Sequence, residues 1–185
     1  MTAPRRAPRT VGLSGNLTNP SRTRWLAEHL VAEVARASGG HGTVYGVLED
    51  CPGLGSTFDR KQAPPALEAV LVAIENCDVL VAVTPVYKGG YAGLFKHLID
   101  LVDMKKLAER PVIVAATGYT ERHASVIDFQ MRPLFAFFGA LVMPSGIFAG
   151  KTDIDDEHRM VPSLQAAVDA AVRQAAAAAQ TRKAT

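Results

Sequence analysis

The sequence has no apolar run that approaches the roughly 20 residues of a membrane-spanning helix. It contains only two cysteines, Cys51 and Cys77, and they do not have the CxxC spacing of a redox or zinc site. We therefore expect free thiols, a reducing compartment and a cytoplasmic location. The net charge of +2 mixes both signs, so it favours neither nucleic acid nor an anionic membrane as a partner.

Motifs of hydrolytic and metal chemistry are also missing. The five histidines show no HxxxH or HExxH spacing, and no GxSxG elbow presents a serine nucleophile. Residues 153–157 begin like a calcium loop, but the sixth position is not Gly and the twelfth is not Glu. His97 and Asp100, one helical turn apart, fit a helix surface or a subunit contact better than a catalytic pair. We expect no metal and no catalytic side chain in the strict sense.

A chain of 185 residues fits one domain, which at this size buries about 70% of its unfolded surface. Residues 1–9 carry three arginines among prolines. A nucleic-acid arm or a targeting signal would also be basic, but no apolar run of secretory length follows. We expect a disordered basic leader at residues 1–9, a single domain at residues 10–180 and a tail at residues 181–185.

Within this domain, short apolar runs alternate with helical stripes. The runs predict five strands, at residues 10–14, 43–48, 78–83, 111–117 and 140–144. The stripes predict five helices, at about residues 21–39, 67–74, 90–104, 123–138 and 164–180.

Strands that alternate with helices imply an α/β fold with a parallel sheet and right-handed crossovers. A five-stranded, doubly wound sheet of order 2-1-3-4-5 fits this pattern. Such a sheet binds ligands at the carboxyl ends of its first and third strands. Three loops reach that place, at residues 14–23, 84–90 and 117–123.

The first loop, SGNLTNPSRT, brings several hydroxyl groups, Arg22 and the N-terminus of a helix together. Unpaired N–H groups at a helix end and a guanidinium suit a phosphate dianion. The loop is neither GxGxxG nor GxxxxGK[ST], which argues against Rossmann dinucleotide and nucleoside-triphosphate sites. Asn, Ser and Thr are also favoured as helix caps, so this loop alone leaves simple capping open.

The second loop, TPVYKGGY, offers features that suit a flat heterocycle. Gly89 and Gly90 permit close approach of the backbone, and Tyr87 and Tyr91 can stack on the ring or wall the site. A turn held by Pro and Gly, with two half-buried tyrosines, explains the same residues. This loop alone does not decide between the two.

Residues 84–101, TPVYKGGYAGLFKHLIDL, resemble the TPVYxxxYxGxLKxxLD signature of NADPH-dependent FMN reductases. The likeness is greatest to the reductases that serve alkanesulfonate and methanesulfonate monooxygenases. The first loop has the spacing of the family's GSxxxxSR[ST] phosphate loop. Residues 116–119, ATGY, resemble its ATGG segment, with Tyr119 in place of the second Gly. The resemblance covers about residues 11–149.

The resemblance implies a flavodoxin-like three-layer sandwich, an FMN site built from the three loops, and a homodimer or homotetramer. Carried over residue by residue, the FMN phosphate would be bound by Ser14, Ser21, Arg22 and Thr23. The isoalloxazine would be flanked by Pro85, Val86 and Tyr87, and contacted on its other side by Thr117 and Gly118. Tyr119 places a side chain where the family tends to leave space.

The implied function is an NAD(P)H:FMN oxidoreductase that supplies reduced FMN to a flavin-dependent monooxygenase, possibly a sulfonate-desulfonating one. FMN and NADPH or NADH would be its cofactors, and hydride transfer to flavin N5 requires no general acid or base. One rival is a quinone or azo-compound reductase with tightly bound FMN. Others are a flavin-free interaction protein and a flavodoxin-type electron carrier, although such carriers are usually acidic and the pI here is about 8.6.

Two further features carry expectations. The stretch at 90–104 is richer in large apolar residues than one core-facing stripe needs, so we expect a subunit interface, with a broad core face as the alternative. Pro133 cannot donate to the carbonyl of Phe129, which predicts a kink or a π-bulge there. Some members of the family carry an inserted Tyr or His at this point, near the subunit interface and the flavin. Phe129 keeps the ring and loses the hydrogen bond.

Overall fold

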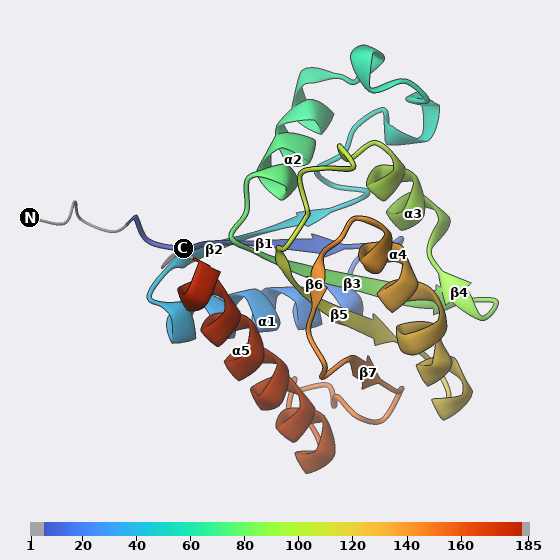
Figure 1. Cartoon of the computed structure of the whole chain (residues 1–185). Coiled ribbons are helices and arrows are strands. Elements are labelled where there is room, and N and C mark those ends of the chain that lie inside the picture. Colours follow the sequence, from blue (N-terminus) through green and yellow to red (C-terminus); the bar gives the residue numbers. More distant parts are fainter. Residues whose placement is uncertain (1–5, 183–185) are drawn as a thin grey trace, which may run out of the picture.

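The computed structural model describes residues 6–182 and shows a single sheet between two layers of helices (Figure 1). The main path of the sheet runs β2-β1-β3-β5-β6, with all neighbours parallel. These strands are β1 (Arg9–Ser14), β2 (His41–Gly46), β3 (Val79–Tyr87), β5 (Pro111–Thr117) and β6 (Leu141–Val142). The predicted α/β class and the order 2-1-3-4-5 are confirmed.

Within the described residues the sheet has seven strands rather than the predicted five. β3 runs on beyond Val83 and turns back into the short antiparallel strand β4 (Gly90–Tyr91). The fifth predicted strand, at residues 140–144, is reduced to β6, and the unpredicted strand β7 (Ile147–Ala149) also pairs with β5. Pro144 lies between them and has no N–H to continue the ladder.

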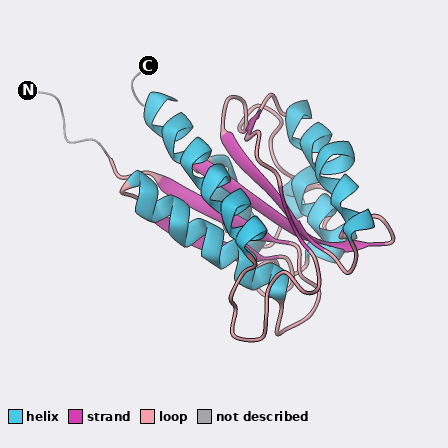
Figure 2. Cartoon of the chain, turned by 90° about the horizontal axis from the view of Figure 1, so that it is seen from below, coloured by secondary structure: helices cyan, strands magenta, loops and turns pink. Residues whose placement is uncertain are grey.

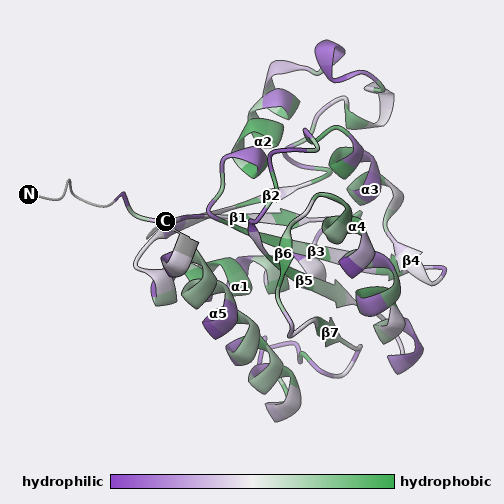
Figure 3. Ribbon diagram, in the orientation of Figure 1, coloured by the Kyte–Doolittle hydropathy of each residue, from purple (hydrophilic) through white to green (hydrophobic). Residues whose placement is uncertain are grey.

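The helices form one layer on each face of the sheet (Figure 2). One layer consists of α1 (Arg22–Ser38) and α5 (Pro162–Arg182). The other consists of α2 (Pro65–Glu75), α3 (Gly93–Asp100) and α4 (Arg132–Phe137). Alternate residues of β3 enter the two hydrophobic cores, Val81 on the α1 side and Leu80 on the α3 side. Figure 3 shows the resulting concentration of hydrophobic residues on the central strands.

Ordered structure extends beyond residues 10–180 at both ends. Pro8 is buried, Arg9 begins β1, and Arg6 forms an ion pair of 2.9 Å with Asp78. Arg6 and Arg9 therefore belong to the ordered fold, because Asp78 directly precedes β3; residues 1–5 and 183–185 are outside the described residues. At the other end, α5 includes residues 181–182 of the predicted tail.

Two helices differ from the sequence pattern. The third begins at Gly93 and ends at Asp100, because Gly90 and Tyr91 belong to β4. The fourth consists of a 3₁₀ turn at Glu121–Ala124, a π-helix at Ile127–Met131 and then α4. The predicted distortion near Phe129 is confirmed, and it takes the form of a π-helix in which the Arg132 N–H donates to the Ile127 carbonyl.

The apolar residues of the third helix pack inside the chain itself. Phe95 and Leu98 are fully buried, and Leu101 and Val102 are nearly so. The alternative of a broad core face therefore accounts for these four residues, and a subunit interface at this helix stays a prediction. Among residues 6–182, no helix is long and apolar enough to cross a membrane.

Candidate functional site

The three predicted loops meet in one cleft of about 240 Å³. The cleft lies where β1, β3 and β5 end, beside the N-terminus of α1. Its lining includes six of the residues predicted to bind FMN: Ser21, Arg22, Thr23, Pro85, Tyr87 and Thr117. Asn16, Leu17, Thr18 and Pro20 complete the lining.

The N-terminus of α1 gives this cleft a positive character. Ser21 caps the helix, and its Oγ accepts a hydrogen bond of 3.3 Å from the Arg24 N–H. The N–H groups of Arg22 and Thr23 belong to the first turn, which has no intrahelical carbonyl to offer them. That turn lies wholly within the described residues and contains no acidic side chain. Free N–H groups and the helix dipole together favour an anion here.

Arg22 is held at the edge of the cleft by the segment after β7. Its Nη1 donates to the carbonyl oxygens of Gly150, at 3.1 Å, and Lys151, at 2.5 Å. Among the described residues that line the cleft, Arg22 alone carries a charge. The cation is therefore anchored by two backbone groups, and it forms no ion pair with a carboxylate of residues 6–182.

Ser14 is fully buried and does not line the cleft. Its Oγ donates to Asn16 Oδ1 at 2.7 Å. Asn16 in turn donates through Nδ2 to the Thr18 carbonyl and to Glu49 Oε1, both at 3.1 Å. Ser14 thus shapes the loop through Asn16, a residue that the sequence reasoning missed. The sequence feature that indicates this role is an asparagine just after a strand, where the side chain can form a hydrogen bond with the backbone two residues further on.

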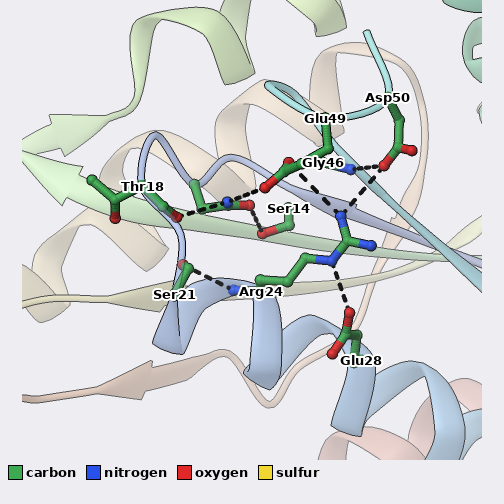
Figure 4. A network of polar contacts seen from close by, with 9 residues as sticks. Ser14, Thr18, Ser21, Arg24, Glu28, Gly46, Glu49 and Asp50 are labelled. Atoms are coloured by element: carbon green, nitrogen blue, oxygen red, sulfur yellow. Dashed lines mark hydrogen bonds and ion pairs between the residues drawn. The ribbon is translucent and has the colours of Figure 1, made fainter.

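Arg24 connects the first loop to the turn after β2 (Figure 4). Its guanidinium pairs with Glu28 at 2.8 Å, Asp50 at 3.3 Å and Glu49 at 3.8 Å. Burial alone would lower the pKa of Arg24, but its hydrogen bonds to Glu28 and Asp50 leave that pKa raised. Arg24 is therefore a structural cation, unlike Arg22.

A buried contact joins the first and third loops. The hydroxyl oxygens of Thr23 and Thr117 lie 2.6 Å apart, and either can donate. Both residues are buried and both line the cleft. Thr23 therefore holds the third loop against the helix that begins in the first.

The second loop presents alternate residues to the cleft. Pro85 and Tyr87 line it, whereas Val86 is buried in the core on the α3 side. Thr84 Oγ1 accepts a hydrogen bond of 3.0 Å from the Ala92 N–H and so holds the hairpin at its base. Tyr87 is 46% exposed, which leaves its ring available to a ligand.

The third loop turns at Gly118, whose N–H donates to the Ala149 carbonyl at 2.9 Å. A Cβ at this position would lie 2.8 Å from the ring of Phe148, so glycine is needed for packing. Tyr119 is 66% exposed. Lys151 Nζ lies 4.8 Å from its ring centroid and donates to its hydroxyl at 3.2 Å. Gly118 and Tyr119 stand beside the cleft rather than in its lining.

The lining residues can bind and orient a ligand, but they include no charged pair of side chains that could transfer a proton. Within the described part of the chain, the lining holds no Asp, Glu, His, Cys or Lys. Outside the lining, burial raises the pKa of Cys51 to about 12, so its thiol stays protonated at neutral pH. An anion cradle beside Pro85 and Tyr87 fits a phosphorylated flat heterocycle, and the residues present are compatible with FMN.

A larger cavity of about 680 Å³ lies on the outer side of the first loop. It shares Pro20, Ser21 and Arg22 with the cleft, and Trp25 and His158 stack there with ring centroids 4.9 Å apart. Neither the second nor the third loop borders it. The smaller cleft is therefore the better candidate, because it alone is bordered by all three loops.

Comparison with known proteins shows the family of this chain. The family model described as NADPH-dependent FMN reductase matches residues 8–155. An FMN reductase (NADPH) of Pseudomonas aeruginosa is 43% identical over 91% of this chain and 90% of its own length. The NADH-dependent FMN reductase SfnF of Pseudomonas fluorescens is 41% identical over the same shares.

A solved structure shows the same fold. An oxidoreductase from Corynebacterium diphtheriae superimposes with a TM-score of 0.81 at 30% identity, covering 95% of this chain and 97% of that one. The family model spans most of the chain, and the two curated reductases match it nearly end to end. This chain therefore belongs to the NADPH-dependent FMN reductase family.

Proposed function

We propose that the chain is an NAD(P)H:FMN oxidoreductase that supplies reduced FMN to a partner flavin-dependent monooxygenase. The observation that carries this proposal is the single cleft in which the N-terminus of α1, Arg22, Pro85 and Tyr87 meet. Relatives named for NADPH and for NADH both match the chain over most of its length, so either nicotinamide cofactor serves as the electron donor.

Each loop has a distinct part in this proposal. Ser21, Arg22 and Thr23 hold the FMN phosphate with the first N–H groups of α1, and Ser14 supports them through Asn16. Pro85 and Tyr87 flank the isoalloxazine, with Val86 behind them in the core. Thr117, Gly118 and Tyr119 approach from the third loop. FMN, when bound, supplies the ring that accepts a hydride from the nicotinamide.

An open site supports transfer of reduced FMN to a partner. Tyr87 and Tyr119, the aromatic residues beside the cleft, are 46% and 66% exposed. A flavin ring placed between them keeps contact with solvent and can leave without unfolding of a lid. The sulfonate-desulfonating class of monooxygenase is the partner that the sequence resemblance suggests. A cytoplasmic location completes the proposal, in keeping with two buried thiols.

The proposal includes a homodimer, or a pair of such dimers, formed through the face between α3 and α4. A largely apolar cavity of about 500 Å³ opens there, bordered by Ile99, Val102, Leu134 and Phe138 and, at two positions, by the charged Lys96 and Asp100. Met104 and Phe137 stand at its rim, 56% and 70% exposed. Large exposed apolar side chains around an apolar hollow are typical of an interface between subunits. A second copy of the chain presents the same apolar side chains, so two such faces can pack against each other.

The proposed activity is tested by following NADH and NADPH oxidation with and without added FMN, beside quinone reduction. We expect oxidation that depends on added FMN, and free FMN in the filtrate after ultrafiltration. Quinone reduction that proceeds without added FMN would favour the rival with tightly bound flavin. Lack of FMN-dependent oxidation with either nucleotide would contradict the proposal.

A further inference from the structure

The hairpin between β3 and β4 contains a strained residue. Val86 pairs with Tyr91 and Tyr87 with Gly90, which leaves Lys88 and Gly89 as the turn. Their φ angles are 50° and 81°, both in the left-handed region, as in a type I′ turn. Glycine adopts this conformation freely, but a lysine with its Cβ does not. Strain of this kind persists only where surrounding contacts impose the conformation.

Gln130 makes such a contact. Its Nε2 donates to the Gly89 carbonyl at 2.7 Å, across 41 residues of sequence. Its Oε1 lies against the next residue, since a Cβ on Gly90 would come within 3.1 Å of it. Figure 1 shows the hairpin lying beside the segment that leads into α4. The side chain of Gln130 therefore contacts both Gly89 and Gly90 at the end of the turn.

The π-helix determines where Gln130 points. Ile127 and Met131 are buried in the core, whereas Phe129 is 79% exposed. A π turn contains one residue more than an α turn, so residues within it, Gln130 among them, point in other directions than they would in an α-helix. Pro133, which lacks an N–H, lies just beyond this segment. The distortion thus places Gln130 toward the hairpin while the core residues stay buried.

We propose that Gln130 is a positioning residue for the second flavin loop. Its amide holds the strained Lys88–Gly89 turn, and the turn fixes Pro85 and Tyr87 at the cleft. This inference rests on the proposed function, since it assigns the loop to the flavin ring. Gln130 does not line the cleft and acts through the loop alone.

The test uses Gln130→Met, which keeps the length of the side chain and removes its amide. Hydrogen exchange of residues 88–91 in the flavin-free protein should become faster. The dissociation constants of FMN and riboflavin should rise together, by about two- to tenfold, as expected for the loss of one hydrogen bond. Gln165→Met removes an exposed amide that bonds Asp169 on α5, and should change neither measurement.

A second variant separates positioning from general damage. Lys88→Asn creates an Asn-Gly pair, which is favoured in type I′ turns. In the Gln130→Met background it should return both the exchange and the flavin affinity toward those of the wild type. Failure of this rescue would contradict the role of the strained turn.

Three outcomes would overturn the inference: unchanged exchange, faster exchange with unchanged flavin affinity, or a loss for FMN much larger than that for riboflavin. A wild-type protein that binds neither flavin would overturn the proposed function and the flavin role together. The exchange measurement would then still show whether Gln130 holds the turn.

Discussion

At the scale of single residues, Arg22 is the charge on which the cleft depends. Charge-assisted hydrogen bonds contribute roughly 1.5–3 kcal/mol, so we expect Arg22→Ala to weaken FMN binding about tenfold or more. Riboflavin lacks the phosphate and should be far less affected. Titration of the flavin-free protein with each ligand measures the two losses.

Arg36→Ala is the matched control for this prediction. Arg36 lies at the opposite end of the same helix, with an exposed side chain paired to Glu33. Its removal should leave both affinities unchanged. Equal losses of affinity for FMN and riboflavin in Arg22→Ala would contradict the assignment of Arg22 to the phosphate. They would indicate instead that Arg22 acts by anchoring residues 150–151.

At the scale of elements, Arg60 joins three segments that are separate in sequence. From the 3₁₀ turn Arg60–Gln62 it pairs with Glu68 on α2 at 2.8 Å and with the buried Glu75 at the end of that helix. Glu75 Oε1 also accepts from the Asp103 N–H, just after α3, at 2.8 Å. This network holds the irregular segment after β2 against both helices.

Glu68 makes part of this network dependent on pH. Its hydrogen bond from Arg60 lowers the pKa of Glu68 below its unfolded value. The contribution is therefore complete above the unfolded pKa of about 4.3 and is lost as the pH falls through the lower folded value. Because Glu68 is 41% exposed, solvent screening limits the effect to about 1 kcal/mol at most.

We expect Glu68→Gln to lower the free energy of unfolding at pH 7 and to lose this difference as the pH falls well below 4.3. Urea denaturation at both pH values measures it. Glu157→Gln, in an exposed turn with Arg159, should have little effect at either. If Glu68→Gln lowered the free energy of unfolding by the same amount at low pH, the variant would have lost packing and not a charge interaction.

At the scale of the whole molecule, the oligomeric state depends on the face between α3 and α4 that we propose as the interface. Phe137→Glu would place like charges against each other across a symmetric interface. We expect the wild type to sediment as a dimer or larger at micromolar concentration and the variant as a monomer. The isolated fold should survive, since the Phe137 side chain is 70% exposed.

Ala166→Glu adds the same charge on the exposed surface of α5, in the opposite helix layer. It should leave the sedimentation of the protein unchanged. A monomeric wild type would contradict the proposed interface outright. The same assembly for Phe137→Glu as for the wild type would move the interface to another face.

The sequence by itself determined the features that depend on neighbours along the chain. Uninterrupted apolar runs predicted buried parallel strands, and Pro133 predicted a distorted helix because a missing N–H acts locally. Alternation of strands and helices predicted the order of the sheet, and that order predicted which three loops meet. Within those loops, the resemblance to the family's motifs predicted the individual residues, among them Ser21 to Thr23, Pro85, Tyr87 and Thr117.

Only the tertiary structure decided which way side chains point and what they contact. Ser14 lies in the expected loop, yet its hydroxyl turns inward to Asn16. The apolar residues at 90–104 face their own core, and Arg6 joins the domain through Asp78. Gln130 reaches a turn 41 residues away. Periodicity and turn chemistry are short-range signals, whereas these contacts depend on how separate elements pack, which no local pattern records.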